Sequence, residues 1–203
     1  DTSELTEDEV ALGLPTTWFF HGELRRIKRP GLYRNLFPGN LDAAHLQFWE
    51  KNPGYDYYWF MEYDVRFTGN WGGFFSHFRK SPGDFLATSI ARRTEIPNWN
   101  LWRSLEMPES VPERAQIRAF IPFYRVSQRG LQALSEEYRR GWSGHQECTV
   151  PTALYTRGLE LEDMGGDGEF VRKENLNRFY RSTVKNNTLS PGTFVFRPPF
   201  AKA

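Results

Sequence analysis

Apolar side chains recur at helical spacing in several parts of the chain. After Asn40 they occupy every third or fourth position up to Pro53, and Asn40 is a residue type that commonly caps helices. The segment after Ser127 shows the same spacing until Gly141, a typical helix terminator. These patterns, with cap residues near the start of the chain and a terminating Gly158, predict helices within residues 1–15, 41–52, 128–140 and 147–157.

Runs of aromatic and aliphatic residues predict the strands. The longest run, YDYYWFMEYDV over residues 55–65, is too continuous for a strand with one face in water. We therefore predict a central strand covered on both faces. Further strands are predicted within residues 16–22, 83–91, 117–126, 159–163 and 192–200. Because helices and strands alternate, we predict an α/β fold with a mixed, mostly parallel central sheet flanked by helices.

The composition limits the size and class of the protein. Its 203 residues, 39% of them hydrophobic and 16% aromatic, suit one α/β domain over residues 1–203. A formal net charge of +1 lacks the basic excess of a dedicated nucleic-acid binder, so we expect no nucleic-acid partner. The single cysteine, Cys148, excludes an intrachain disulfide framework and a cysteine-rich zinc site. Since no apolar run reaches about 18 residues, we expect no transmembrane segment and a soluble protein, and its compartment, with the cytoplasm as one option, is left open.

Two charged segments leave alternatives open. Residues 23–40 are predicted as a loop, and its five Arg and Lys between residues 25 and 34 form either a solvated patch or a contact to phosphate or a lipid surface. The second alternative implies peripheral contact with a membrane. The acidic, glycine-rich residues 161–169 are predicted as a flexible loop, with a lid or an acceptor contact as the alternative.

Two carboxylates end the aromatic strand. Residues i and i+2 of a strand project to the same side about 7 Å apart, so Glu62 and Asp64 are predicted to face one site. Ligands of α/β sheets bind beyond the carboxyl ends of the strands, and two hard oxygen donors suit Mg²⁺ or Mn²⁺. The alternative is that both side chains enter solvent or pair with Arg66.

A glycine-rich loop is predicted directly after these carboxylates, in the sequence RFTGNWGGFF. Gly69, Gly72 and Gly73 allow tight turns, and Trp71 offers a flat apolar face that can stack on a sugar or a base. The candidate substrate contacts in this segment are Arg66, Asn70, Trp71 and Gly72.

The stretch YWFMEYDVRFTGNW resembles GT-A-type glycosyltransferases, which use nucleotide-diphospho-sugars as donors. In that family a short D-x-D motif at the end of a central strand holds a metal ion bound to the donor diphosphate. Here the motif reads E-Y-D, and the resemblance implies that Glu62 and Asp64 hold Mn²⁺ or Mg²⁺ on a nucleotide-sugar donor. Since only 61 residues precede Glu62, the resemblance implies a GT-A-like fold in which either the nucleotide-binding half is abbreviated at its N-terminus or the chain lacks its start.

A second segment carries the same resemblance, GWSGHQECTVPTAL. Glycosyltransferases of this fold often present a carboxylate at the start of a helix after a glycine-containing loop. Here that implies Glu147 as the base that takes the acceptor proton. The alternative is an ordinary carboxylate stabilised by the helix dipole. His145 is predicted to be a loop or capping residue, with a contact to substrate as the alternative.

The resemblance implies a metal-dependent glycosyltransferase. Such an enzyme moves a sugar from a nucleotide-diphosphate donor to the hydroxyl of a glycan, a lipid-linked sugar or another acceptor. Two other classes are open at this point. One is a non-catalytic carbohydrate-binding or assembly module. The other is a glycoside hydrolase, whose two carboxylates stand about 5 Å or about 6.5 to 9.5 Å apart.

Overall fold

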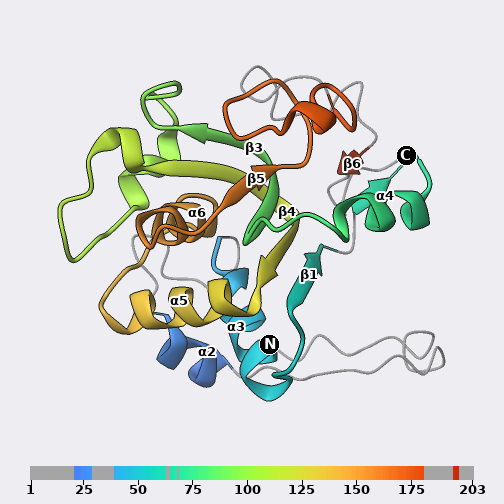
Figure 1. The fold of residues 1–203 in the computed structure, drawn as a ribbon. Helices are drawn as coiled ribbons and strands as arrows, with labels where there is room; N and C mark the ends of the chain where they lie inside the picture. Colours follow the sequence, from blue (N-terminus) through green and yellow to red (C-terminus); the bar gives the residue numbers. More distant parts are fainter. Residues whose placement is uncertain (1–20, 29–38, 63–64, 68, 181–193, 197–203) are drawn as a thin grey trace, which may run out of the picture.

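A mixed four-stranded sheet forms the centre of the molecule (Figure 1). The structure is a computed structural model, and it describes residues 21–28, 39–62, 65–67, 69–180 and 194–196. The strand order is β1-β4-β3-β5. The four strands are β1 (Tyr57–Met61), β4 (Ile117–Ser127), β3 (Phe85–Arg92) and β5 (Leu161–Asp163).

The directions of these strands decide where their ends meet. Strand β4 runs antiparallel to both of its neighbours, β1 and β3, while β3 and β5 are parallel. The mixed sheet is therefore confirmed, but a mostly parallel one is not, because two of the three described pairings are antiparallel. Strands β1, β3 and β5 still share one direction, so their carboxyl ends point the same way.

Most of the described helices pack together on one face of the sheet (Figure 1), and α4 contributes side chains to the core on the other face. Helices α5 and α6 pack on β4, and α3 packs against both of these helices. Helix α2 packs outside them, on α3 and α5. A short ladder of β2 and β6 and three 3-10 turns complete the described part. The bounds are α2 (His21–Ile27), α3 (Leu41–Lys51), α4 (Trp71–Phe78), α5 (Gln128–Arg139), α6 (Gln146–Thr156), β2 (Val65–Phe67), β6 (Phe194–Phe196), η1 (Asn100–Ser104), η2 (Glu113–Ala115) and η3 (Lys173–Asn175).

Alternation along the strands divides the core into two clusters. Tyr124 of β4 and Phe60 of β1 belong to the cluster beneath α3, α5 and α6. Phe123 of β4, with Trp59 packed beside it, belongs to the cluster beneath α4. Successive side chains of a strand point to opposite faces, so each strand supplies both clusters. Each fully buried Phe in these clusters contributes roughly 1.5 to 3 kcal/mol through the apolar surface it removes from water.

Three predicted helices are confirmed at residues 41–51, 128–139 and 146–156. Ser127 caps α5 as expected, because its Oγ accepts a hydrogen bond from the Gly130 N–H at 3.0 Å. Asn40 precedes α3, but its side chain makes no capping hydrogen bond. The predicted strands within residues 83–91, 117–126, 159–163 and 192–200 are also present. The helix predicted within residues 1–15 lies outside the described residues.

The position predicted for the aromatic strand is wrong. Strand β1 covers only residues 57–61 and lies at the edge of the described sheet, while β4 lies inside it. Ten of the eleven residues of β4 are buried, whereas Tyr57 and Met61 of β1 are 36% and 56% exposed. The aromatic residues of β1 therefore contribute both to the core and to an exposed surface.

Two predicted loops form helices instead. His21 and Gly22, expected in a strand over residues 16–22, begin α2, and residues 23–27 of the predicted basic loop continue it; residues 16–20 lie outside the described part. The predicted glycine-rich loop forms α4 over residues 71–78. The Asn70 side chain caps α4, and Phe74 and Phe78 bury one face of it at i, i+4 spacing. Capping and packing together outweigh the low helix propensity of glycine.

Candidate functional site

An irregularity in β4 brings the end of β1 and the start of α6 together. The pairing of β3 with β4 jumps from Leu86–Arg125 to Thr88–Phe120, so residues 121–124 of β4 bulge away from the ladder. The carbonyl of Pro122 in this bulge accepts a hydrogen bond from the Glu62 N–H at 2.7 Å. The neighbouring Ile121 N–H donates to the carboxylate of Glu147. One short stretch of β4 therefore holds both carboxylate residues.

Glu147 is a carboxylic acid with a near-neutral pKa. It lies in the first turn of α6 and is half-buried. Its pKa is raised from 4.5 to about 7; burial is the largest cause and the negative charge of Glu62 adds to it, while Arg118 and the Ile121 N–H oppose the shift. Glu62 and Glu147 are thus close enough to repel one another. A carboxylate with a pKa near the working pH is suited to act as a general base or acid.

Glu62 lies on the face of the sheet that α6 covers, which is the face from which it can interact with Glu147. It is half-buried and follows β1 in phase with Tyr58 and Phe60, whose side chains point toward α3. Its charge also raises the pKa of Tyr124, although burial and Asp42 contribute more. The predicted second metal ligand, Asp64, lies outside the described residues. In the part that the structure describes, no cluster of three or more His, Cys, Asp or Glu could hold a metal ion.

Uncharged side chains form the interior wall next to Glu62. The Nδ1 of His45 lies 2.5 Å from the Tyr124 hydroxyl, and the His45 ring stacks on Phe60 with centroids 4.1 Å apart. Burial lowers the pKa of His45 to about 4, against the opposing charge of Asp42. His45 is therefore neutral near pH 7 and adds no positive charge that would neutralise the carboxylates.

His145 caps the helix that carries Glu147. Its ring Nδ1 accepts a hydrogen bond from the Glu147 backbone N–H at 3.3 Å, and the backbone N–H of His145 donates to Ser104 Oγ at 3.0 Å. Burial, then the charge of Lys28, lower the pKa of His145 to about 4, which keeps Nδ1 available as an acceptor. The capping interpretation is confirmed, and a contact to substrate stays a prediction.

The other predicted substrate residues lie around α4. Arg66 is exposed on β2, and Gly72 is exposed in the first turn of α4. The Asn70 side chain accepts a hydrogen bond from the Gly73 N–H at 2.7 Å. Trp71 is half-buried against aromatic side chains of the cluster beneath α4. That cluster is on the opposite face of the sheet from α6, so the structure does not join Trp71 to Glu147.

A buried arginine next to this site was not predicted. Arg118 of β4 interacts electrostatically with Glu147, Asp163 and Tyr180, and burial lowers its pKa. Its guanidinium group lies 5.4 Å from the ring centroid of Trp99. An arginine inside the apolar run of residues 117–126 was the available sequence signal, because such a charge is buried only when other groups compensate it.

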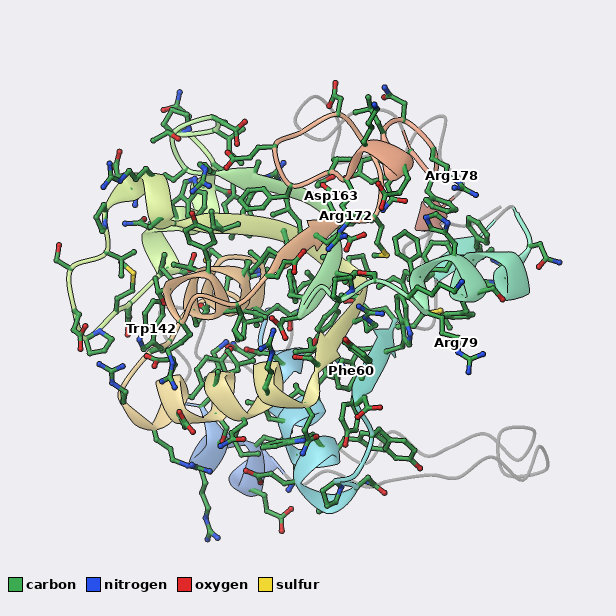
Figure 2. The ribbon with its side chains drawn as sticks, in the orientation of Figure 1. Phe60, Arg79, Trp142, Asp163, Arg172 and Arg178 are labelled. Atoms are coloured by element: carbon green, nitrogen blue, oxygen red, sulfur yellow. The ribbon has the colours of Figure 1, made fainter. Side chains whose placement is uncertain are left out.

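Asp163 ends β5 (Figure 2) and binds an irregular part of β3, where the register with β4 shifts between Thr88 and Ala91. Ser89 has a φ of 53°, in the left-handed region that residues with a side chain rarely adopt. Its N–H donates to the Tyr180 hydroxyl at 2.6 Å, and the Ile90 N–H donates to Asp163 at 2.9 Å. The Tyr180 hydroxyl in turn donates to Asp163. The start of the acidic segment, predicted as a flexible loop, is therefore buried structure.

Asp163→Ala is expected to lower the free energy of unfolding by about 2 to 4 kcal/mol, because the Ile90 and Gly165 amides and the Tyr180 hydroxyl lose their acceptor. Burial raises the pKa of Asp163 to about 7. Because this pKa is raised from 3.8, the unfolded chain releases the Asp163 proton at lower pH than the native state does, so the wild type loses stability as the pH rises from about 4 to about 7. The loss caused by Asp163→Ala should therefore be larger at pH 5 than at pH 8.

Urea denaturation at both pH values measures this difference, with Glu169→Ala as the matched control. Glu169 is 49% exposed and pairs with Arg92 at the surface, so its loss should cost less than about 1 kcal/mol. Equal losses in the two variants would show that Asp163 does not hold the irregular part of β3.

Comparisons with protein-family models, curated proteins and solved structures found no match. The resemblance to GT-A-type glycosyltransferases therefore stays a prediction that rests on the sequence. In the part of the chain that the structure describes, no helix has the length and apolar character needed to cross a membrane.

Proposed function

We propose that the protein is a metal-dependent glycosyltransferase of GT-A type, in which Glu147 is the catalytic base. The observation that carries this proposal is the meeting of Glu62 and Glu147 at the β4 bulge, with the pKa of Glu147 at about 7. The two residues belong to separate sequence segments that both resemble the same family. The proximity of Glu62 and Glu147 supports the resemblance, because neither sequence segment alone indicates that the two residues lie close together.

In this proposal, Glu147 accepts the proton of the acceptor hydroxyl. The acceptor oxygen then forms a bond to the anomeric carbon of the donor sugar, and the bond from that carbon to the diphosphate breaks. The nucleotide diphosphate leaves with the bonding electrons. The Ile121 N–H and Arg118 stabilise the ionised form of Glu147, and burial together with Glu62 makes it basic enough to accept a proton near pH 7.

The donor diphosphate needs a counter-charge as it leaves. Glu62 presents a half-buried carboxylate at the end of β1, and carboxylate oxygens are the ligands that Mg²⁺ and Mn²⁺ prefer. Glu62 would hold such a cation together with Asp64. When bound, the cation supplies stabilisation of the negative charge on the leaving nucleotide.

A glycoside hydrolase is the second candidate function. A carboxyl group with a raised pKa beside a second carboxylate is the arrangement that such hydrolases use, with the protonated group as the acid. The pKa of Glu147 near 7 and the neighbouring Glu62 fit these roles as well. The two functions differ in their requirement for a metal ion and a nucleotide.

Mn²⁺ together with a UDP- or GDP-sugar is expected to raise the melting temperature by about 5 to 10 °C at saturating concentrations, whereas either alone raises it much less. Glu62→Ala should remove the joint effect, because it removes a ligand of the cation. Differential scanning fluorimetry measures both, with Glu113→Ala, an exposed carboxylate outside the site, as the control.

The same assay distinguishes the alternatives. Stabilisation by free oligosaccharides without metal would favour the hydrolase or a carbohydrate-binding module. A joint effect of Mn²⁺ and nucleotide-sugar that persists in Glu62→Ala would contradict the metal assignment.

A further inference from the structure

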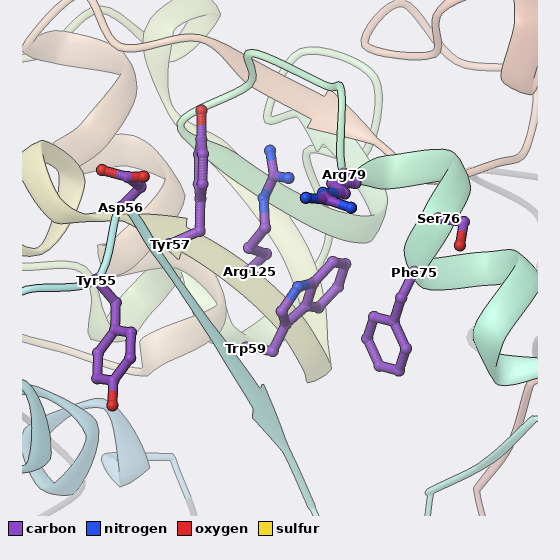
Figure 3. Close-up of a pocket in the computed structure, with 8 residues that line it drawn as sticks. All are labelled: Tyr55, Asp56, Tyr57, Trp59, Phe75, Ser76, Arg79 and Arg125. Atoms are coloured by element: carbon purple, nitrogen blue, oxygen red, sulfur yellow. The ribbon is translucent and has the colours of Figure 1, made fainter.

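An open groove of about 510 Å³ lies between β1 and α4 (Figure 3). This volume falls within the range of about 300 to 1,000 Å³ that is typical of ligand pockets. Aromatic rings form much of its wall, and a few polar side chains stand among them. The lining residues are Tyr55, Asp56, Tyr57, Trp59, Phe75, Ser76, Arg79 and Arg125.

The groove concentrates exposed aromatic surface. Tyr55, Tyr57 and Phe75 are 65%, 36% and 38% exposed, and they are three of the five large hydrophobic residues that are exposed in the described part of the chain. Met61, a fourth, lies on the same face of β1 as Tyr57. Scattered exposed apolar side chains need no explanation, but a cluster that lines a groove marks a binding surface.

Two of the aromatic rings that line the groove are held in place by contacts with neighbouring side chains. The guanidinium group of Arg125 lies 4.0 Å from the ring centroid of Tyr57 and donates hydrogen bonds to the carbonyls of Phe78, Ser81 and Gly83. Trp59 stacks on Phe123 with centroids 5.0 Å apart. These contacts fix the rings before any ligand arrives, which lowers the entropic cost of binding.

The charge of the groove is positive. Two guanidinium groups, those of Arg79 and Arg125, and one carboxylate, that of Asp56, line it. Within the described residues neither arginine forms an ion pair, since the nearby Asp84 and Glu162 pair with Arg129 and Arg172. Arg79 is exposed and reaches the groove directly, whereas Arg125 is buried and acts through its charge.

We propose that this groove binds a glycan that carries an acidic group. Aromatic faces pack on the apolar faces of sugar rings, and an arginine beside them binds a carboxylate or sulfate through charge-assisted hydrogen bonds. The exposed guanidinium group of Arg79 is the donor that an acidic substituent would contact, and a neutral glycan lacks that contact. Tyr57 and Trp59 point to the face of β1 opposite Tyr58, Phe60 and Glu62, so the groove is separate from the carboxylate pair.

Isothermal titration calorimetry at low salt tests this site with three probes of equal length. They are a galacturonic acid tetrasaccharide, a sulfated heparin-derived tetrasaccharide and neutral mannotetraose. We expect at least one acidic probe to bind about tenfold or more tightly than mannotetraose, and which one it is identifies the acidic group. A glutamate-rich hexapeptide is the rival probe.

Matched variants locate the binding. Arg79→Ala should weaken binding of the acidic probe about tenfold or more, while Lys80→Ala, the adjacent exposed cation outside the groove, should change it less than about twofold. Tyr55→Ala should weaken it by about two- to tenfold without lowering the melting temperature, because this ring is largely exposed.

The proposal is overturned if no tetrasaccharide binds, if the peptide binds more tightly than all three, or if Arg79→Ala and Lys80→Ala behave alike. The outcome is independent of the transferase proposal. Glu147→Gln should leave acidic-glycan binding unchanged, and loss of binding in Arg79→Ala should leave the joint effect of Mn²⁺ and nucleotide-sugar intact.

Discussion

Glu147→Gln is expected to lower kcat for sugar transfer by about 10² to 10⁴-fold, the usual contribution of a positioned general base. The amide retains the shape of the side chain and can still accept the hydrogen bond from the Ile121 N–H, so the fold should persist. Initial rates with a saturating nucleotide-sugar donor measure the loss. Glu136→Gln, a carboxylate on the surface of α5, serves as the control and should retain full activity.

The same substitution has a predicted effect on stability. Because the pKa of Glu147 is raised from 4.5 to about 7 in the folded protein, the native state binds the extra proton, and stability falls as the pH rises through this interval. Glu147→Gln should therefore be more stable than the wild type at pH 8, by roughly 1 to 3 kcal/mol after allowance for its partial exposure, and about equally stable near pH 4. If Glu147→Gln transfers sugar at the normal rate and its stability depends on pH as that of the wild type does, Glu147 is not the catalytic base.

Asp42→Ala is expected to lower the free energy of unfolding by about 3 to 5 kcal/mol. Asp42 and Lys28 are each 1% exposed, and the Lys28 Nζ lies 2.8 Å from the Asp42 carboxylate. The Tyr138 hydroxyl also donates to Asp42, and the Asp42 N–H donates to Gln146 Oε1 at 3.1 Å. The substitution leaves a buried ammonium group without its counter-charge, in the place where α2, α3, α5 and α6 meet.

Equilibrium urea denaturation of four proteins tests this expectation: the wild type, Asp42→Ala, Lys28→Met and the double variant. Removal of both charges should recover part of the loss, since no uncompensated ion is then buried. Glu50→Ala is the control, because Glu50 and Arg139 form an exposed pair at 3.9 Å that should contribute less than about 1 kcal/mol. Additive losses in the double variant would show that the two charges do not stabilise one another.

Helices with one apolar face were the most predictable part of the fold. Leu131, Leu134 and Tyr138 recur at helical spacing and are buried along one face of α5. The sequence between Ser127 and Gly141 contains the cap, the periodicity and the terminator of this helix, so no long-range information was needed. The positions of α3 and α6 along the chain follow from similar local patterns.

The place of a strand in the sheet was not predictable in this way. A strand that is buried on both faces and a strand that is partly exposed at the sheet edge can have the same apolar sequence pattern. For this reason β1 was predicted as a central strand. Its aromatic side chains serve both the core and the exposed groove beside α4. Helix α4 was missed because its two glycines outweighed the Phe74 and Phe78 spacing when the tertiary contacts of these rings were unknown.

Half of the candidate site was foreseen. Glu147 was expected at a helix N-terminus, and Glu62 at the end of a strand, and both placements are confirmed. Arg118 was missed, and the buried role of Asp163 was not foreseen, because both depend on the bulges that offset β3 from β4. Such bulges result from contacts between segments far apart in the chain, and no local pattern encodes them.

The central claim is that Glu62 and Glu147 act on one another in a single site, and a carboxyl titration tests it most directly. In protein labelled with ¹³C at the glutamate carboxyl carbons, NMR spectra recorded from pH 3 to pH 9 give the pKa of Glu147, assigned by its absence in Glu147→Gln. The structure predicts a value of about 7 that falls in Glu62→Gln, when the repelling charge is removed. A value near 4.5 in the wild type, or a value unchanged by Glu62→Gln, would contradict the account.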